Sequence, residues 1–187
     1  MKNIILLFLF FLLGNIYCFS QYDVRKVNWG MSKQQVEKSE KYLKKLKNED
    51  EESLTYKTTL LNKEVYLDYS FKENKLRSVF YYFERNHTNH NDYIDDYIDL
   101  KEALIKKYGE PSSDDIIWEN NLHKDNLQEY GLAISVGHLE YLTQWTHINN
   151  TTNIVLNLYG KDNKINLNIL YASLKALIED KQDPDGL

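Results

Sequence analysis

The chain has few of the residues that redox, metal and nucleotide chemistry require. Its single cysteine, Cys18, lies within the first twenty residues, so no disulfide, thiolate metal site or cysteine nucleophile is expected after it. The seven glycines never have G-x-G spacing, which excludes a dinucleotide-binding fingerprint and a Walker loop. The motifs H-E-x-x-H, G-x-S-x-G and C-x-x-C are missing as well. We therefore expect no cofactor, and a catalytic site would have to be assembled from residues distant in sequence.

Positive charge is not in excess. The chain carries 23 Lys and Arg against 28 Asp and Glu, a formal net charge of −5 at pH 7. Loss of Lys2 with a leader would take this charge to −6. A mildly acidic protein without a basic stripe repels a polyanion. Nucleic acid is therefore not an expected partner.

One long apolar run stands at the start of the chain. Residues 4–13 (IILLFLFFLL) follow Lys2, but this run is about half of the roughly 20 residues that a helix needs to cross a bilayer. A positive end, a short apolar run and a polar exit are typical of a cleaved signal peptide over residues 1–20. Small side chains one and three residues before the cut place it between Ser20 and Gln21. We predict an exported protein, periplasmic or extracellular, without a transmembrane segment in the mature chain.

Lipidation of Cys18 is the alternative. Lipoprotein signals have a small residue directly before the cysteine, whereas Tyr17 occupies this position. A lipid on Cys18 would anchor the protein in the outer membrane.

The first half of the chain is predicted to contain one helix and three strands. Ser32 and Gln35 form a capping box, so a helix starts at Lys33. Its apolar stripe continues toward the acidic run at Glu49 through Val36, Leu43 and Leu46. Composition and alternation predict strands over 54–60, 65–71 and 76–83. Residues 79–83 are apolar on both faces, which predicts a central strand covered on both sides.

The second half is predicted to repeat this order. We predict a helix that begins at Asp92, because the apolar residues recur at helical spacing and acidic residues cluster in its first turns. Gly109 and Pro111 end this helix. Strands are predicted over 116–118, 139–145, 154–158 and 165–171, with a helical stretch in 125–136 and a short helix over 173–181.

These elements predict an α+β fold. We expect two helix–three-strand pseudo-repeats, 29–84 and 92–171, that form an antiparallel sheet with helices packed on one face. No linker rich in Pro, Gly or Ser separates them. Residues 21–181 are therefore expected to form a single domain, and 182–187 a flexible tail.

Two segments resemble parts of small exported bacterial proteins. The segment 30–36 (GMSKQQV) resembles the G-M-[ST]-x-x-[EQ]-V start of their repeats, and 107–111 (KYGEP) resembles the G-x-P that ends a helix in them. Such proteins include the SmpA/OmlA outer-membrane lipoproteins and the β-lactamase-inhibitor-protein-like folds. The resemblance implies a sheet-plus-helix binding or scaffolding module, and it supplies no catalytic residues.

Two groups of histidines are candidates for chemistry. His87, His90 and Asp92 lie within six residues and could bind zinc or copper, although a polar loop before a helix explains them as simply. His138 or His147 could act as a general base beside an acid, but the sequence identifies no nucleophile for either. A satisfied structural histidine is the simpler interpretation of both.

Tyrosine is abundant, with 15 residues in all. The ring suits half-buried sheet positions, and it is also enriched at protein–protein interfaces. On the strand that turns Val65 and Leu67 inward, Tyr66 must face the other way. If no helix covers that face, an aromatic patch is exposed, and Tyr66, Tyr81 and Tyr82 are its candidate binding residues.

The sequence therefore favours a non-enzymatic protein that binds or scaffolds another envelope protein, whose identity it does not reveal. Two alternatives stay open. One is a small envelope hydrolase with a site built from scattered His, Asp and Glu residues, and the other is a metal-binding protein that uses His87 and His90.

Overall fold

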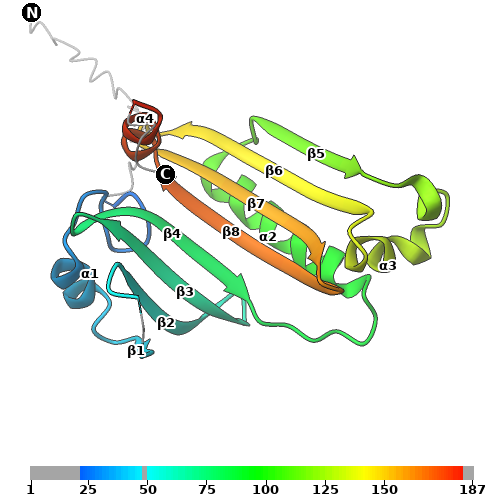
Figure 1. Ribbon diagram of the computed structural model, residues 1–187, viewed down its shortest axis with the longest axis horizontal. Helices are drawn as coiled ribbons and strands as arrows, with labels where there is room; N and C mark the ends of the chain where they lie inside the picture. The colour runs from blue at the N-terminus through cyan, green and yellow to red at the C-terminus, as the bar shows by residue number, and fades with distance from the viewer. Residues whose placement is uncertain (1–21, 48–49, 183–187) are drawn as a thin grey trace, which may run out of the picture.

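The computed structural model describes residues 22–47 and 50–182 (Figure 1). Cys18, Ser20 and Gln21, on which the predictions of cleavage and lipidation depend, lie outside the described residues, as does the tail after residue 182. Within the described part of the chain, no helix is long and apolar enough to cross a bilayer.

Eight strands form one antiparallel sheet of order β1-β2-β3-β4-β8-β7-β6-β5. Their bounds are β1 Lys44–Lys45, β2 Ser53–Leu60, β3 Lys63–Lys72, β4 Lys75–Phe83, β5 Ser113–Trp118, β6 Leu139–Ile148, β7 Thr152–Lys161 and β8 Lys164–Ser173. The two halves of the chain meet where β4 pairs with β8 at the centre of the sheet (Figure 1). The predicted α+β class and antiparallel sheet are confirmed, with β1 as an additional two-residue edge strand.

In the described part of the chain, four α-helices accompany the sheet: α1 Lys33–Ser39, α2 Asp92–Tyr108, α3 Tyr130–Ser135 and α4 Leu174–Gln182. The prediction for α2 is confirmed at both ends, since the helix begins at Asp92 and Gly109 caps it with a φ of 83°. The stretch 125–136 is helical only in part. Two 3₁₀ turns, η1 Asn121–His123 and η2 Leu127–Glu129, precede the six residues of α3.

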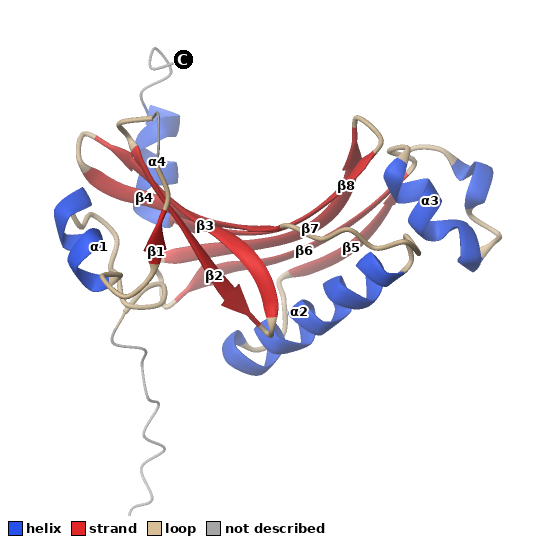
Figure 2. Cartoon of the chain, turned by 90° about the horizontal axis from the view of Figure 1, so that it is seen from below, coloured by secondary structure: helices blue, strands red, loops and turns tan. Residues whose placement is uncertain are grey.

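The helix α2 packs against β6, β7 and β8 on the convex side of the curved sheet (Figure 2). The hydroxyl groups of Tyr97 on α2 and Thr143 on β6 form a hydrogen bond. Trp145, which is fully buried, donates from Nε1 to the carbonyl oxygen of Gly109 at 2.8 Å. The inward side chains of β2, β3, β4, β7 and β8 complete this core, and they include Leu54, Leu67, Val79, Leu156 and Ile169.

The first helix is shorter than its apolar stripe predicts. The capping box of Ser32 and Gln35 is confirmed, but α1 ends at Ser39 and the predicted extension toward Glu49 is wrong. The reason lies in the next residue, Glu40, which is 2% exposed. Its carboxylate accepts hydrogen bonds from Arg25 Nε at 2.8 Å and from the hydroxyl of Tyr69 at 2.6 Å. This tertiary network ends the helix and ties the N-terminal segment to β3.

The strand β4 is central, as predicted, but it is covered on one side only. Val79, Tyr81 and Phe83 point into the core and are buried. Phe80 is only partly buried, and Tyr82 is 47% exposed. The prediction of cover on both faces is therefore wrong for Phe80 and Tyr82, although α4 contacts the start of β4 through the ion pairs of Arg77 with Glu179 and Asp180.

Candidate functional site

The side of the sheet turned away from α2 is concave, and within 22–47 and 50–182 no helix lies across it (Figure 2). The helix α4 stands at the rim of this surface. We call this surface the open face. From β2 to β6 it is formed by Lys57, Tyr66, Asp68, Phe80, Tyr82, Asn168, Leu170, Val155, Asn157, Leu142 and Gln144.

Two rows of directly paired residues cross the open face. One row runs from β3 through β4, β8 and β7 to β6 as Asp68, Phe80, Leu170, Val155 and Gln144. The other follows the same strands as Tyr66, Tyr82, Asn168, Asn157 and Leu142. Directly paired side chains lie roughly 5 Å apart, so each row is continuous. The centre of the open face is thus apolar and aromatic in one row. The other row has aromatic and amide side chains, of which Asn168 is buried at 4% exposure.

The aromatic part of the open face lies on β3 and β4. The rings of Phe80 and Tyr82 are 4.1 Å apart between centroids, at an angle of 48°. Partial burial and the nearby Asp68 carboxylate raise the pKa of the Tyr82 hydroxyl. Of the tyrosines that the sequence singled out, Tyr66 and Tyr82 belong to the open face. Tyr81 does not, because it points into the core and is 4% exposed.

Charged groups lie beside Tyr66. A hydrogen bond to Glu84 and the charge of that carboxylate raise the pKa of the Tyr66 hydroxyl. Lys57 Nζ lies 5.9 Å from the centroid of the Tyr66 ring and 3.1 Å from Glu64 Oε2. Lys57 is therefore ion-paired with Glu64 on β3.

Asp68 is the carboxylate at the centre of this aromatic region. It accepts hydrogen bonds from Thr55 Oγ1 at 2.7 Å and from Ser70 Oγ at 3.4 Å. Burial raises the pKa of Asp68, although these hydrogen bonds act in the opposite direction. The sequence analysis missed Asp68 and Phe80 as site residues. The signal was present, since Asp68 alternates with Tyr66 on the same face of a predicted strand.

The histidines that could bind a metal are not brought together. His87 Nε2 lies 2.7 Å from Asp96 Oδ2 on α2, and its Nδ1 is 3.9 Å from Asp92 Oδ2. His90 is exposed and packs edge-on against the ring of Tyr93. Among the described residues, no group of three or more His, Cys, Asp or Glu side chains could hold a metal ion. His87 instead joins α2 to the segment before it.

The two histidines considered as a general base, His138 and His147, have structural neighbours. The ring of His138 stacks on that of His123 at 5.6 Å, and its Nδ1 is buried without a hydrogen-bond partner among the described residues. His147 has a φ of 58°, and its N–H donates to Asn153 Oδ1 at 2.9 Å. Neither forms an ion pair with a carboxylate in the described ranges. The neighbouring His123 does have a carboxylate partner, since its Nδ1 lies 2.7 Å from Glu129 Oε2.

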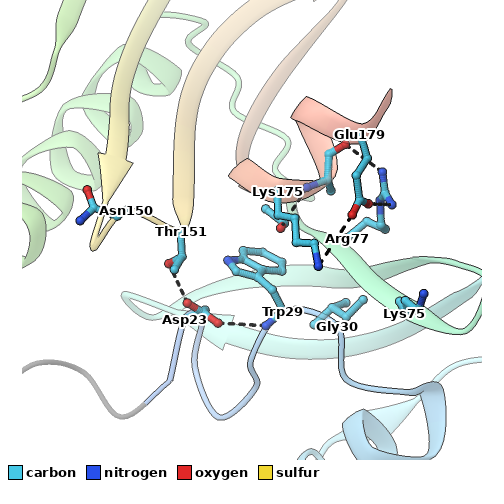
Figure 3. Close-up of a pocket in the computed structure, with 12 residues that line it drawn as sticks. Asp23, Trp29, Gly30, Lys75, Arg77, Asn150, Thr151, Lys175 and Glu179 are labelled. Atoms are coloured by element: carbon cyan, nitrogen blue, oxygen red, sulfur yellow. Dashed lines mark hydrogen bonds and ion pairs between the residues drawn. The ribbon is translucent and has the colours of Figure 1, made fainter. Parts of the chain in front are cut away.

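A hollow of about 390 Å³ lies between the N-terminal segment, the start of β4 and α4 (Figure 3). Trp29 donates from Nε1 to Thr152 Oγ1 at 2.9 Å and from its backbone N–H to Asp23 Oδ2 at 2.9 Å. On the other wall, Arg77 Nη1 lies 2.8 Å from Glu179 Oε2. These polar groups satisfy one another, so the contacts serve to fasten the N-terminal segment and α4 to the end of the sheet.

Comparison of the chain with protein-family models, with curated proteins and with solved structures finds no match in any of the three. The function must therefore be inferred from the geometry of the open face.

Proposed function

We propose that this protein is an exported, non-enzymatic module of the cell envelope that holds another protein against the open face. The observation that carries the proposal is the uncovered strip of aromatic and apolar side chains on the concave side of the sheet, formed by Phe80, Tyr82, Leu170 and Val155. Apolar surface rimmed by polar side chains is typical of interaction sites, and tyrosine is common at their centres. The amides of Asn157 and Gln144 add hydrogen-bonding groups around the strip.

Export is the second part of the proposal. A cut between Ser20 and Gln21 would leave intact the contacts that fix the start of the fold. Thr151 Oγ1 donates to Asp23 Oδ1 at 2.7 Å, and Arg25 binds Glu40. The intact mass of the native protein tests this part. A chain that begins at Gln21 is the expected result, whereas a lipid-bearing mass beginning at Cys18 would replace cleavage by lipidation.

A finer description of the fold belongs to the proposal as well. The order of elements, α1 followed by β1–β4 and α2 followed by β5–β8, supports two pseudo-repeats that share one sheet. Cover by helices on one face would then leave the opposite face free for a partner, as the resemblance to exported binding modules implies.

The test of the binding function is a differential capture experiment. The mature chain serves as bait in envelope extract of the organism that produces it, beside a Tyr66→Ala/Tyr82→Ala double variant of the open face. The matched control is Tyr42→Ala, because Tyr42 is 82% exposed and lies outside the open face.

We expect the wild-type chain and Tyr42→Ala to retain the same partner and the double variant to lose it. Equal capture by all three baits would place the binding surface elsewhere and overturn the proposal. Circular dichroism of the three baits checks that the sheet is intact in each.

A further inference from the structure

Asp68, which is half-buried, differs in its surroundings from the buried carboxylates of this fold. Glu40, 2% exposed, has Arg25 at 2.8 Å, and Asp96, 6% exposed, has Lys63 at 2.9 Å. Asp68 has hydroxyl donors but no Lys, Arg or His within ion-pair distance among the described residues. A carboxylate withdrawn from water without a cation costs stability. Asp68 is therefore a candidate for a role other than holding the fold together.

The lysines of neighbouring strand positions are bound elsewhere. Lys57 on β2 lies 3.1 Å from Glu64, and Lys72 on β3 lies 3.2 Å from Asp180 on α4. Neither is available to Asp68 without breaking its own ion pair.

Aromatic residues of β3 and β4 lie beside Asp68 on the open face, while Thr55 of β2 is its neighbour on the other side. Phe80 is its direct partner on β4, and Tyr66 precedes it by two residues on β3. Tyr82 pairs with Tyr66, and its ring packs against that of Phe80 at a tilt of 48°. The faces of aromatic rings attract cations, and a carboxylate at their centre adds a hydrogen-bonding counterion. This combination is suited to an ammonium or guanidinium group.

We propose that Asp68, Tyr66, Phe80 and Tyr82 together form a receiving site for a lysine or arginine side chain of the protein that the open face holds. The proposal deepens the function proposed above and depends on it. We call these four residues the Asp68 site.

Charge at the far side of the open face supports a basic partner. Glu140 on β6 also has no cation partner among the described residues, and burial together with Glu119 raises its pKa. Asp115, opposite Leu142 on the edge strand β5, is exposed. The open face thus has acidic groups on both sides of its apolar strip, which complements a segment with basic residues on both sides of an apolar centre. A second copy of this acidic chain would be repelled by the same charges.

The test uses fluorescent decapeptides that alternate serine with lysine or with arginine. The matched probe replaces each lysine by Nε-acetyl-lysine, which keeps the stem of the side chain and removes its charge. Each probe is titrated against the wild-type mature chain, Asp68→Asn and Asp95→Asn. Asp95 is exposed on α2 and outside the open face, so this control removes the same charge from the protein.

We expect wild type and Asp95→Asn to bind the lysine or arginine peptide equally. Asp68→Asn should bind it about tenfold more weakly or worse, the effect of losing one charge-assisted hydrogen bond. The acetylated peptide should lose affinity for wild type by a similar factor. Three outcomes would each overturn the assignment. The basic peptides could bind Asp68→Asn as tightly as wild type, wild type could bind charged and acetylated peptides equally, or neither basic peptide could bind at all. A preference of wild type for phosphatidylcholine vesicles over both peptides would also overturn it, in favour of a quaternary ammonium headgroup.

Failure of this inference is distinguishable from failure of the proposed function. If Asp68→Asn captures the envelope partner as well as wild type while the Tyr66→Ala/Tyr82→Ala variant does not, the open face binds protein without an ion pair at Asp68. If all three capture it equally, the binding function itself fails.

Discussion

Two aspartates of this fold allow one substitution to be compared in opposite electrostatic surroundings. The carboxylate of Asp96 has three basic side chains around it, with Lys63 Nζ at 2.9 Å, His87 Nε2 at 2.7 Å and Arg85 Nε at 3.3 Å. Asp68 has none in the described part of the chain. We expect Asp96→Asn to lower the free energy of unfolding at pH 7 and Asp68→Asn to raise it.

The size of each change in the free energy of unfolding depends on which charged groups remain unpaired after the carboxylate is removed. Removing one partner of a buried ion pair costs about 3–5 kcal/mol. Because Lys63 keeps a second carboxylate, Asp99, at 2.9 Å, we expect Asp96→Asn to cost about 2–3 kcal/mol, below that range. In Asp68→Asn no ion pair is lost, and the amide oxygen can still accept the hydrogen bond from Thr55. Removal of a partly buried, unpaired charge should raise the free energy of unfolding by about 0.5–1 kcal/mol.

The dependence on pH has opposite signs at the two sites. Burial acts to raise the pKa of Asp96, but hydrogen bonds from His87 and Lys63 and the charges of Lys63 and Arg85 lower it overall. Its stabilising contribution is therefore present above the ordinary value of 3.8 and lost as the pH falls through the folded pKa. For Asp68 the folded pKa is raised, so its destabilising contribution is absent below 3.8 and develops as the pH rises through the folded pKa.

Urea unfolding at pH 7 and at mildly acidic pH measures both effects. Tryptophan fluorescence reports the transition, because Trp145 is fully buried in the core. The midpoints should move in opposite directions at pH 7 with unchanged slopes. On mild acidification the difference between Asp68→Asn and wild type should shrink, because the folded pKa of Asp68 is raised. The difference between Asp96→Asn and wild type should persist there and be lost only below 3.8, because the folded pKa of Asp96 is lowered. If both variants lose stability to the same extent at pH 7, the view of Asp68 as an uncompensated charge is refuted.

Three further predictions concern other parts of the fold. Gly160→Ala places a Cβ atom 1.7 Å from the carbonyl oxygen of Ile134 and should cost at least about 3 kcal/mol in chemical denaturation; a change below 1 kcal/mol would contradict the tight contact between α3 and β7. Arg25→Met leaves the buried carboxylate of Glu40 without its cation, so chemical denaturation should show the free energy of unfolding lowered by about 3–5 kcal/mol. Unchanged stability would show that this network does not hold the N-terminal segment. Tyr82→Ala removes a ring that is 47% exposed. In thermal unfolding the free energy of unfolding should fall by no more than about 1.5 kcal/mol, the value of one aromatic pair. A larger loss of stability would mean that the ring belongs to the core.

Local patterns in the sequence account for most elements of the fold. Asp92 to Gly109 contains its own start, stripe and stop signals, so α2 was predictable at both ends. The capping box at Ser32 likewise depends on residues three apart. Alternation along β3 was sufficient to assign Tyr66 to the face opposite Leu67. Information within a few residues determines these features, and it can be read from one sequence.

Features that depend on distant residues could not be predicted in the same way. The end of α1 depends on Glu40, whose partners Arg25 and Tyr69 come from other elements. The exposure of Tyr82 depends on where the helices lie, because the apolar run 79–83 is equally compatible with one or two covered faces. The partner of His87 is Asp96, nine residues along the chain on α2, rather than the adjacent His90. In each case the deciding contact is tertiary.

The attachment of Asp23 to the far end of the chain has a consequence for the timing of folding. The hydrogen bond from Thr151 to Asp23 joins residues 128 apart in sequence, and the central strand β4 finds its second neighbour only in β8. Contacts of such long range slow the search for the native state, since a long loop must close before they form. A polypeptide with this connectivity stays incomplete until almost its entire length has been delivered. If the chain is exported as proposed, this delay would keep it unfolded while it crosses the membrane, and the sheet would close only after the last strand has crossed.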